Sequence, residues 1–233
     1  MTMFTRESAA KKLIIDLSRK MNERGYTASN DMNISWRIGA KLFLTLPVGV
    51  FADTLDEEMI IKMDLDGNVL FARDCYIPSP DAGMHIEIFK QFPTVLGVIN
   101  AQPPYATLSS ILARPLERAL LPNIVFDLGV LPVAPYAAPG SKKLAEAVAL
   151  TCKGHNGMLL QNRGVLVWGI NGVEALHRLE LAEQFAFLSW NIGKGNEYSL
   201  SQDALEEILE KRKLWDIQSG GIPLSKGEVV END

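Results

Sequence analysis

The sequence of 233 residues has few cysteines, no excess of basic residues and no long apolar run. Its two cysteines, Cys75 and Cys152, lack the spacing of a metal motif. We interpret them as reduced thiols, with a single bridge between them as the alternative. Lysine and arginine number 23 against 28 acidic residues, which disfavours nucleic acid as a partner. No stretch approaches the roughly 18 apolar residues of a membrane span, and the first ten residues do not resemble a signal peptide. We therefore predict a cytoplasmic protein without membrane contact.

The residues that are present are typical of an ordinary folded domain. Apolar residues make up 47% of the chain and charged residues 22%, which excludes disordered and fibrous proteins. A chain of this length buries roughly 70–75% of the surface that its unfolded form exposes, so one core can form without disulfides or metals. No repeat or linker divides the sequence. We predict one domain over residues 1–218 and a mobile tail over residues 219–233.

Hydrophobic periodicity alternates between helical and strand patterns along the chain. Apolar residues recur at helical spacing over residues 5–24, 81–92, 105–113, 141–151, 172–192 and 202–215. Short apolar runs between glycines and prolines predict strands at 33–37, 41–46, 59–63, 69–71, 95–100, 124–126, 130–133, 158–161 and 165–168. Glycine-containing turns at 66–67 and 162–164 predict two hairpins. The elements together predict an α/β fold with helix, sheet and helix layers around a largely antiparallel sheet.

Five segments carry motifs whose order is more informative than any one of them. Residues 32–37 are Met-Asn-Ile-Ser-Trp-Arg, residues 46–49 are Leu-Pro-Val-Gly, and residues 64–68 are Asp-Leu-Asp-Gly-Asn. Residues 78–85 are Pro-Ser-Pro-Asp-Ala-Gly-Met-His, and residues 134–145 are Ala-Pro-Tyr-Ala-Ala-Pro-Gly-Ser-Lys-Lys-Leu-Ala. In this order the segments resemble the class II aldolase/adducin family, and the resemblance extends over roughly residues 13–188.

The resemblance implies a three-layer α/β/α fold with a mixed sheet, and a ring-shaped homotetramer with active sites between neighbouring subunits. It also implies carbon–carbon lyase chemistry on a sugar phosphate. In the zinc aldolases of the family, a His-x-His strand and an Asn-His-Gly turn hold the metal while a glutamate moves protons. The family's phosphate-binding positions correspond here to Asn33, Gly49 and Ser79, although Asn33 and Ser79 could instead only support turns.

The zinc ligands of the family are replaced in this chain. Asn100 and Gln102 stand at the two strand histidines, Arg163 stands at the third histidine, and Asp81 stands at the glutamate. Neutral amides bind zinc poorly compared with imidazole, and a guanidinium repels a second cation. We therefore expect no metal and no other cofactor.

Asp81 and Arg163 are the candidate catalytic residues. In the family fold they would face each other across the vacated metal pocket, and a buried guanidinium requires a partner. One hypothesis is an ion pair that plugs the site, with Asn100 and Gln102 completing its hydrogen bonds. The other is that Arg163 stays free to bind a carboxylate or a phosphate.

None of the three histidines falls at a ligand position. His85 lies within the predicted helix 81–92, where packing is its expected role. His155 lies in a predicted turn, and His177 lies beside Arg178 on the predicted helix 172–192. Without convergent partners, none is expected to act as a catalytic base.

Two functions are consistent with these residues. The first is a metal-free, catalytically degenerate family member that acts in binding or assembly, as the adducin head domain does. The second is a lyase that acts on a small sugar phosphate or carboxylate without zinc. In that case Arg163 would stabilise developing negative charge and Asp81 would carry a proton. A zinc aldolase with misaligned ligands is a third alternative. The expected partners are a small anionic metabolite and further copies of the chain.

Overall fold

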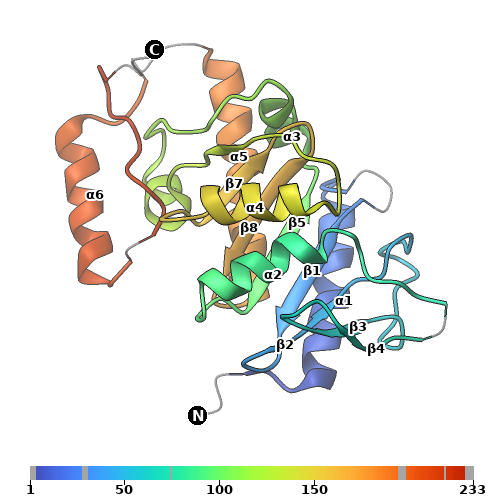
Figure 1. Cartoon of the computed structure of the whole chain (residues 1–233). Coiled ribbons are helices and arrows are strands. Elements are labelled where there is room, and N and C mark those ends of the chain that lie inside the picture. Colours follow the sequence, from blue (N-terminus) through green and yellow to red (C-terminus); the bar gives the residue numbers. More distant parts are fainter. Residues whose placement is uncertain (1–3, 28–30, 74, 194–197, 218, 229–233) are drawn as a thin grey trace.

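The fold is a mixed sheet covered by helices on both faces (Figure 1). The computed structural model describes residues 4–27, 31–73, 75–193, 198–217 and 219–228. The sheet has eight strands in the order β4-β3-β2-β1-β5-β8-β7-β6. Neighbouring strands are antiparallel except β6 and β7, which are parallel. The strands are β1 (Asn33–Arg37), β2 (Leu42–Thr45), β3 (Ile61–Asp64), β4 (Val69–Phe71), β5 (Gly97–Ala101), β6 (Val133–Ala134), β7 (Gly157–Leu160) and β8 (Gly164–Gly169).

Each predicted helix is present, with bounds that differ by two residues or fewer from the predicted ones. Side-chain caps start three of them, because the hydroxyl of Ser141, the amide of Asn171 and the hydroxyl of Ser201 each accept a backbone N–H of the first turn. The helices are α1 (Glu7–Glu23), α2 (Ala82–Gln91), α3 (Pro104–Ile111), α4 (Lys142–Thr151), α5 (Gly172–Ile192) and α6 (Gln202–Leu214).

Two hydrophobic clusters join the helices to the two faces of the sheet. Helices α1, α3 and α5 cover one face, and α2 and α4 cover the other. Leu179 and Phe185 of α5 belong to the first cluster, whereas Phe89 of α2 and Val148 of α4 belong to the second, and all four are fully enclosed. Burying one such side chain contributes about 1.5–3 kcal/mol. The predicted three-layer fold with a largely antiparallel sheet is confirmed.

One predicted strand is wrong and another is shorter than expected. Residues 124–126 are predicted as a strand but belong to η1 (Ile124–Leu128), a π-helical turn that ends at Gly129 with φ +78°. A short apolar run has the same pattern whether it forms a buried strand or a buried turn. Here Ile124 and Val125 pack into two different hydrophobic clusters. Of the predicted strand 130–133, only Val133 pairs in the sheet, together with Ala134.

The described part of the predicted tail is held against the domain by backbone hydrogen bonds. The Val130 N–H donates to the Gly220 carbonyl at 2.6 Å, and the Leu224 N–H donates to the Glu117 carbonyl at 2.6 Å. The buried Arg212 guanidinium donates to the Gly221 carbonyl at 3.0 Å. Residues 229–233 of the predicted tail lie outside the described residues.

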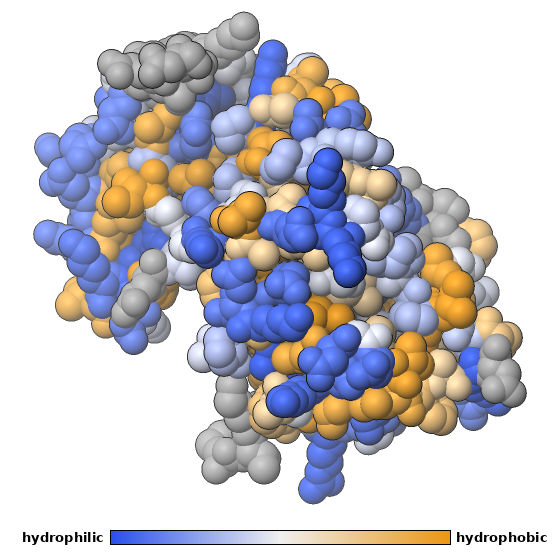
Figure 2. Space-filling model, in the orientation of Figure 1, coloured by the Kyte–Doolittle hydropathy of each residue, from blue (hydrophilic) through white to orange (hydrophobic). Residues whose placement is uncertain are grey.

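The exposed hydrophobic residues, the state of the cysteines and the length of the helices complete the description of the fold. Hydrophobic side chains gather on the surface over the edge strand β4, where Val69, Leu70 and Phe71 are about half exposed (Figure 2). Cys75 and Cys152 are both free thiols, the first exposed and the second buried. Within the described residues, every helix is too short or too polar to cross a membrane.

Candidate functional site

Arg163 and Asp81 form a largely buried ion pair between the hairpin that precedes β8 and the start of α2. Arg163 lies in the hairpin between β7 and β8, and Asp81 is the residue before the first turn of α2. The Nη2 atom of Arg163 lies 2.5 Å from both carboxylate oxygens of Asp81. The side chain of Asp81 is 3% exposed and that of Arg163 is 15% exposed. The geometry is that of the ion pair predicted from the sequence.

The hairpin that carries Arg163 fits closely against the end of β5. Asn162 and Gly164 both have positive φ, at +58° and +116°. A Cβ atom on Gly164 would lie 2.3 Å from the carbonyl oxygen of Ala101, so only glycine allows this approach. The Gly164 N–H donates to the Ser110 hydroxyl of α3 at 3.1 Å. These contacts fix the hairpin at the position from which Arg163 reaches Asp81.

Asn100 and His85 continue the polar contacts beneath the ion pair. The Nδ2 group of Asn100 on β5 donates to Asp81 Oδ2 at 3.1 Å. The His85 ring of α2 lies with Nε2 2.8 Å from Asn100 Oδ1 and Nδ1 2.8 Å from the Ser35 hydroxyl of β1. Both Asn100 and His85 are buried. The predicted part of Asn100 in the hydrogen bonds of the ion pair therefore agrees with the structure.

The contacts extend from Ser35 to the turn after β2. The hydroxyls of Ser35 and Thr45 are 3.0 Å apart, and the Thr45 hydroxyl is 3.0 Å from Asn33 Oδ1. Asn33 Oδ1 also accepts the Leu46 N–H at 3.3 Å. Asn33 is fully buried, and its Nδ2 group has no partner among the residues that the structure describes.

Burial controls the protonation of His85. The pKa of the ring is lowered to about 4, mainly by burial and to a smaller extent by the Arg163 charge, while the Asp81 charge and the hydrogen bond to the Asn100 oxygen act in the opposite direction. The ring is therefore neutral at pH 7. From the sequence, packing is the expected role of His85, and its hydrogen bonds to Asn100 and Ser35 were not predicted. Its spacing of four residues from Asp81 was the available signal, because residues i and i+4 of a helix share one face.

Gln102 does not take part in the ion pair, so that prediction is wrong. Its Nε2 group donates to Asp31 Oδ2 at 2.5 Å. Gln102 follows the last residue of β5, and its backbone N–H donates to the Tyr26 carbonyl at 3.0 Å. Gln102 lies beyond the end of β5, and its side chain therefore reaches Asp31, just before β1, instead of Asp81.

The two other predicted phosphate-binding residues lie in neighbouring turns. The Ser79 hydroxyl accepts the Asp81 N–H at 3.2 Å, and the Ser79 N–H donates to the Leu46 carbonyl at 3.3 Å. Gly49 is exposed, with φ +80°, in the turn after β2. Ser79 therefore joins this turn to the start of α2, which is the turn-supporting geometry that the sequence left open for it.

The donor set at the expected zinc positions does not fit zinc. The amide of Asn100 is engaged by Asp81 and His85, Gln102 is bound to Asp31, and Arg163 carries a positive charge. Across the described ranges, no group of three or more His, Cys, Asp or Glu side chains could hold a metal ion. The cluster can instead bind through charge and hydrogen bonds, or move a proton.

The other two histidines lie elsewhere. The Nδ1 atom of His155 is buried without a partner among the described residues, and burial lowers the pKa of the ring. His177 is half exposed, with Nε2 3.5 Å from Asp127 Oδ2. Among the described residues, neither histidine contacts the ion pair.

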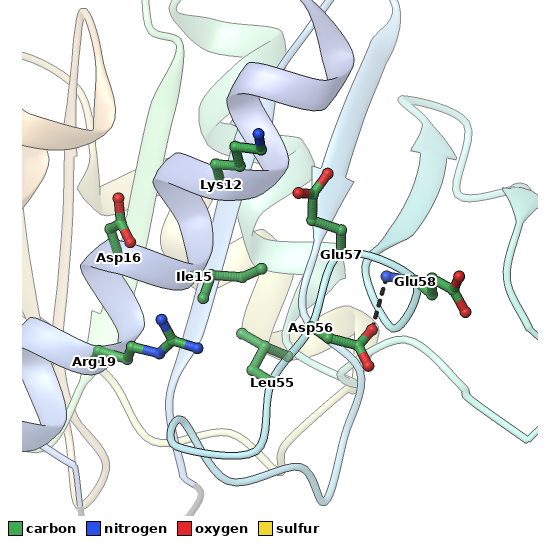
Figure 3. Close-up of a pocket in the computed structure, with 8 residues that line it drawn as sticks. All are labelled: Lys12, Ile15, Asp16, Arg19, Leu55, Asp56, Glu57 and Glu58. Carbon is green, nitrogen blue, oxygen red and sulfur yellow. Dashed lines mark hydrogen bonds between the residues drawn. The ribbon is translucent and has the colours of Figure 1, made fainter.

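A separate surface pocket lies between α1 and residues 55–58 (Figure 3). Its volume is about 600 Å³. Lys12 and Arg19 of α1 line it opposite Asp56 and Glu57, and the Glu58 N–H donates to Asp56 Oδ1 at 2.8 Å. It contains none of the predicted site residues.

Comparisons with known proteins identify similar sequences along most of the chain. Residues 12–190 match the family described as Class II Aldolase and Adducin N-terminal domain. A 3-oxo-tetronate 4-phosphate decarboxylase from Haemophilus influenzae is 29% identical over 208 residues, which cover 88% of this chain and 97% of that protein. An L-fuculose phosphate aldolase from Methanocaldococcus jannaschii is 30% identical over 179 residues, which cover 77% and 94%.

Solved structures show the same fold. An L-fuculose 1-phosphate aldolase superposes with a TM-score of 0.80 at 28% identity and covers 91% of this chain and 100% of its own. A second L-fuculose-1-phosphate aldolase, from Thermus thermophilus, superposes with a TM-score of 0.67 at 18% identity and covers 90% and 96%. The second comparison bears on the fold alone.

Proposed function

Because this chain belongs to the class II aldolase and adducin family, we propose that it is a metal-independent member that acts in binding or assembly rather than in zinc-dependent cleavage. The observation that carries this proposal is the position of Arg163. A guanidinium 2.5 Å from a buried carboxylate stands where the family places an imidazole ligand. Zinc at that point would have to displace a cation from its carboxylate partner, and the two strand positions would offer it neutral amides in place of imidazoles.

The polar site at the ion pair is the proposed binding site for a small metabolite. It offers a charged donor in Arg163 and, around the turn after β2, the amide of Asn33 and the backbone near Gly49. The proposed setting is the cytoplasm, and the proposed assembly is a homo-oligomer with the tetrameric form that the family resemblance implies.

A second candidate function is a lyase that needs no metal. It is favoured by the names of the relatives that match most of the chain, a decarboxylase and an aldolase. In such an enzyme, Arg163 would stabilise negative charge that develops on a small sugar phosphate or carboxylate, and Asp81 would carry the proton.

Metal analysis tests the main proposal. The purified chain is dialysed against buffer with excess zinc, then against zinc-free buffer, and its metal content is measured by mass spectrometry. We expect far less than one zinc ion per chain. Retention of one zinc ion per chain would refute metal independence.

Turnover separates the two candidate functions. The chain is incubated with a panel of sugar phosphates and small hydroxy acids, with and without a chelator, and the products are followed by NMR. A binding protein raises its melting temperature with a ligand but leaves the ligand unchanged. Cleavage that persists with chelator and is lost in Arg163→Ala would instead establish the metal-independent lyase.

A further inference from the structure

The guanidinium of Arg163 uses only part of its hydrogen-bonding capacity. An arginine side chain has five N–H donors on three nitrogen atoms. Within the part of the chain that the structure describes, its hydrogen bonds to Asp81 both start from Nη2, and Nε is buried without a partner. Arg163 is also the more exposed member of the pair. An anion that enters from solvent therefore reaches the Arg163 guanidinium, which has unused N–H donors, before it reaches the Asp81 carboxylate.

Beneath this cation, five contacts at hydrogen-bond distance form one continuous chain. Each of the five requires one hydrogen atom. The members of the polar chain, in order, are Asp81, Asn100, His85, Ser35, Thr45 and Asn33.

The two ends of the polar chain supply no hydrogen. Asp81 is a carboxylate beside a guanidinium and can only accept. At the other end, the Leu46 N–H donates to Asn33 Oδ1, which fixes the orientation of the amide and turns its oxygen towards Thr45. Both ends are therefore acceptors.

The members between the ends supply one hydrogen too few. The amide of Asn100, the ring of a neutral His85, and the hydroxyls of Ser35 and Thr45 each contribute one hydrogen. That makes four hydrogens for five contacts. In the neutral state one contact therefore brings two acceptors together inside the protein, which costs free energy.

One additional proton completes the polar chain. On His85, it makes both ring nitrogens donors, towards Asn100 and Ser35. The charged groups that act on the ring are Asp81, which favours the proton, and Arg163, which opposes it. Strands β2 and β5 carry no charged side chain.

The remaining charged group on the adjacent strand is engaged elsewhere. Arg37 of β1 is buried and donates to the carbonyls of Phe89 and Ala40. Its guanidinium also lies over the Phe89 ring, at 4.9 Å from the ring centre. Burial lowers the pKa of His85 most, and the ion pair supplies the charges that act on the ring, so a change at Arg163 is transmitted to the proton.

On the basis of the proposed function, we propose that the metabolite is a small organic anion whose carboxylate or phosphate group pairs with Arg163. We further infer that His85 takes up one proton from solvent when this anion binds. The anion offsets the Arg163 charge that opposes the proton. The proton in turn supplies the hydrogen that the polar chain lacks, so the two events favour each other.

Calorimetry with simple probes tests both parts. The carboxylate probe is L-lactate and the oxyanion probe is sulfate, since neither titrates near neutral pH, and glycerol is the uncharged control. Titrations in imidazole and in Bis-Tris at the same pH separate the heat of binding from the heat of proton transfer to buffer. We expect an anion to bind with uptake of up to one proton, and its affinity to fall by up to about tenfold per pH unit of increase.

Variants locate the proton. In His85→Gln, the new amide donates to Asn100 and no ring remains, so the anion should bind with no proton uptake. His177→Gln removes a half-exposed histidine outside the polar chain and should leave the uptake unchanged. If His85→Gln does not fold, ¹⁵N NMR of the histidine rings in the unaltered protein shows whether His85 becomes doubly protonated on binding.

The outcomes separate this inference from the proposed function. Anion binding without proton uptake, or uptake that persists in His85→Gln, would overturn the proton linkage. Failure of both anions to bind would overturn the ligand class and leave metal independence untouched. Retention of zinc by the purified chain would instead refute the proposed function itself.

Discussion

Arg163 holds both carboxylate oxygens of Asp81 through a single nitrogen, with Asp81 3% exposed beneath it. Removing one partner of a buried pair leaves the other charge uncompensated. We expect Arg163→Ala to lower the free energy of unfolding by about 2–4 kcal/mol, as measured by urea denaturation.

A double-mutant cycle provides the control. The loss in Arg163→Ala/Asp81→Ala should be smaller than the sum of the two single losses, because no unpaired charge remains. Lys211 and Glu207 form an exposed pair on α6 and serve for comparison, since their separation should change stability little. Additive effects at Arg163 and Asp81 would show that the two side chains do not interact.

Restoring three histidines should create a zinc site. If side-chain identity rather than backbone position prevents metal binding, the triple variant Asn100→His/Gln102→His/Arg163→His gains two imidazoles at the end of β5 and one on the facing hairpin. We expect it to retain about one zinc ion per chain in the metal analysis described above. Gln161→His, on the same hairpin, should retain none. A triple variant that folds but binds no zinc would place the obstacle in the backbone.

His85 should make the protein sensitive to acid. Its pKa is about 4 in the folded protein and about 6.5 when unfolded, so the unfolded chain binds the proton first as the pH falls. Stability is therefore unaffected by His85 above about pH 6.5 and falls by about 3 kcal/mol between pH 6.5 and pH 4. Urea denaturation across this range should show a shallower decline in His85→Gln. Parallel curves for the two proteins would argue against a buried neutral ring.

Gly97 should not tolerate a side chain. A Cβ atom there would lie 2.6 Å from the backbone of Gly172, where α5 begins against β5. Gly97→Ala should cost about 2–3 kcal/mol in urea denaturation. Gly83 lies within α2 with open space around its Cβ position, so Gly83→Ala should instead stabilise by about 0.5–1 kcal/mol. Equal effects at the two positions would contradict the close packing of α5 on β5.

The layer architecture could be predicted because periodicity and burial agree along most of the chain. Helix α5 has the predicted bounds, as do strands β1 and β4. Prediction failed at η1, where a run of branched apolar residues is buried from both sides without pairing in the sheet. The hydrophobic periodicity of a sequence predicts that a residue is buried but does not predict which element packs over it.

The candidate site could be predicted in part. The contact of Arg163 with Asp81 followed from opposite charges at facing family positions. The partner of Gln102 did not, because it depends on where the chain turns after β5. The hydrogen bonds of His85 join three elements that are distant in sequence, and their arrangement emerges only when α2 packs across β1 and β5.

The segment after α6 has a consequence for how the protein is made. Gly220 and Leu224 bond to the backbones of Val130 and Glu117, about a hundred positions earlier in the chain. Until the ribosome has added residues 220–224, the loops that contain Val130 and Glu117 are complete but lack their partners. Folding during translation can therefore form the sheet early, whereas these loops are secured only after residues 220–224 have been added.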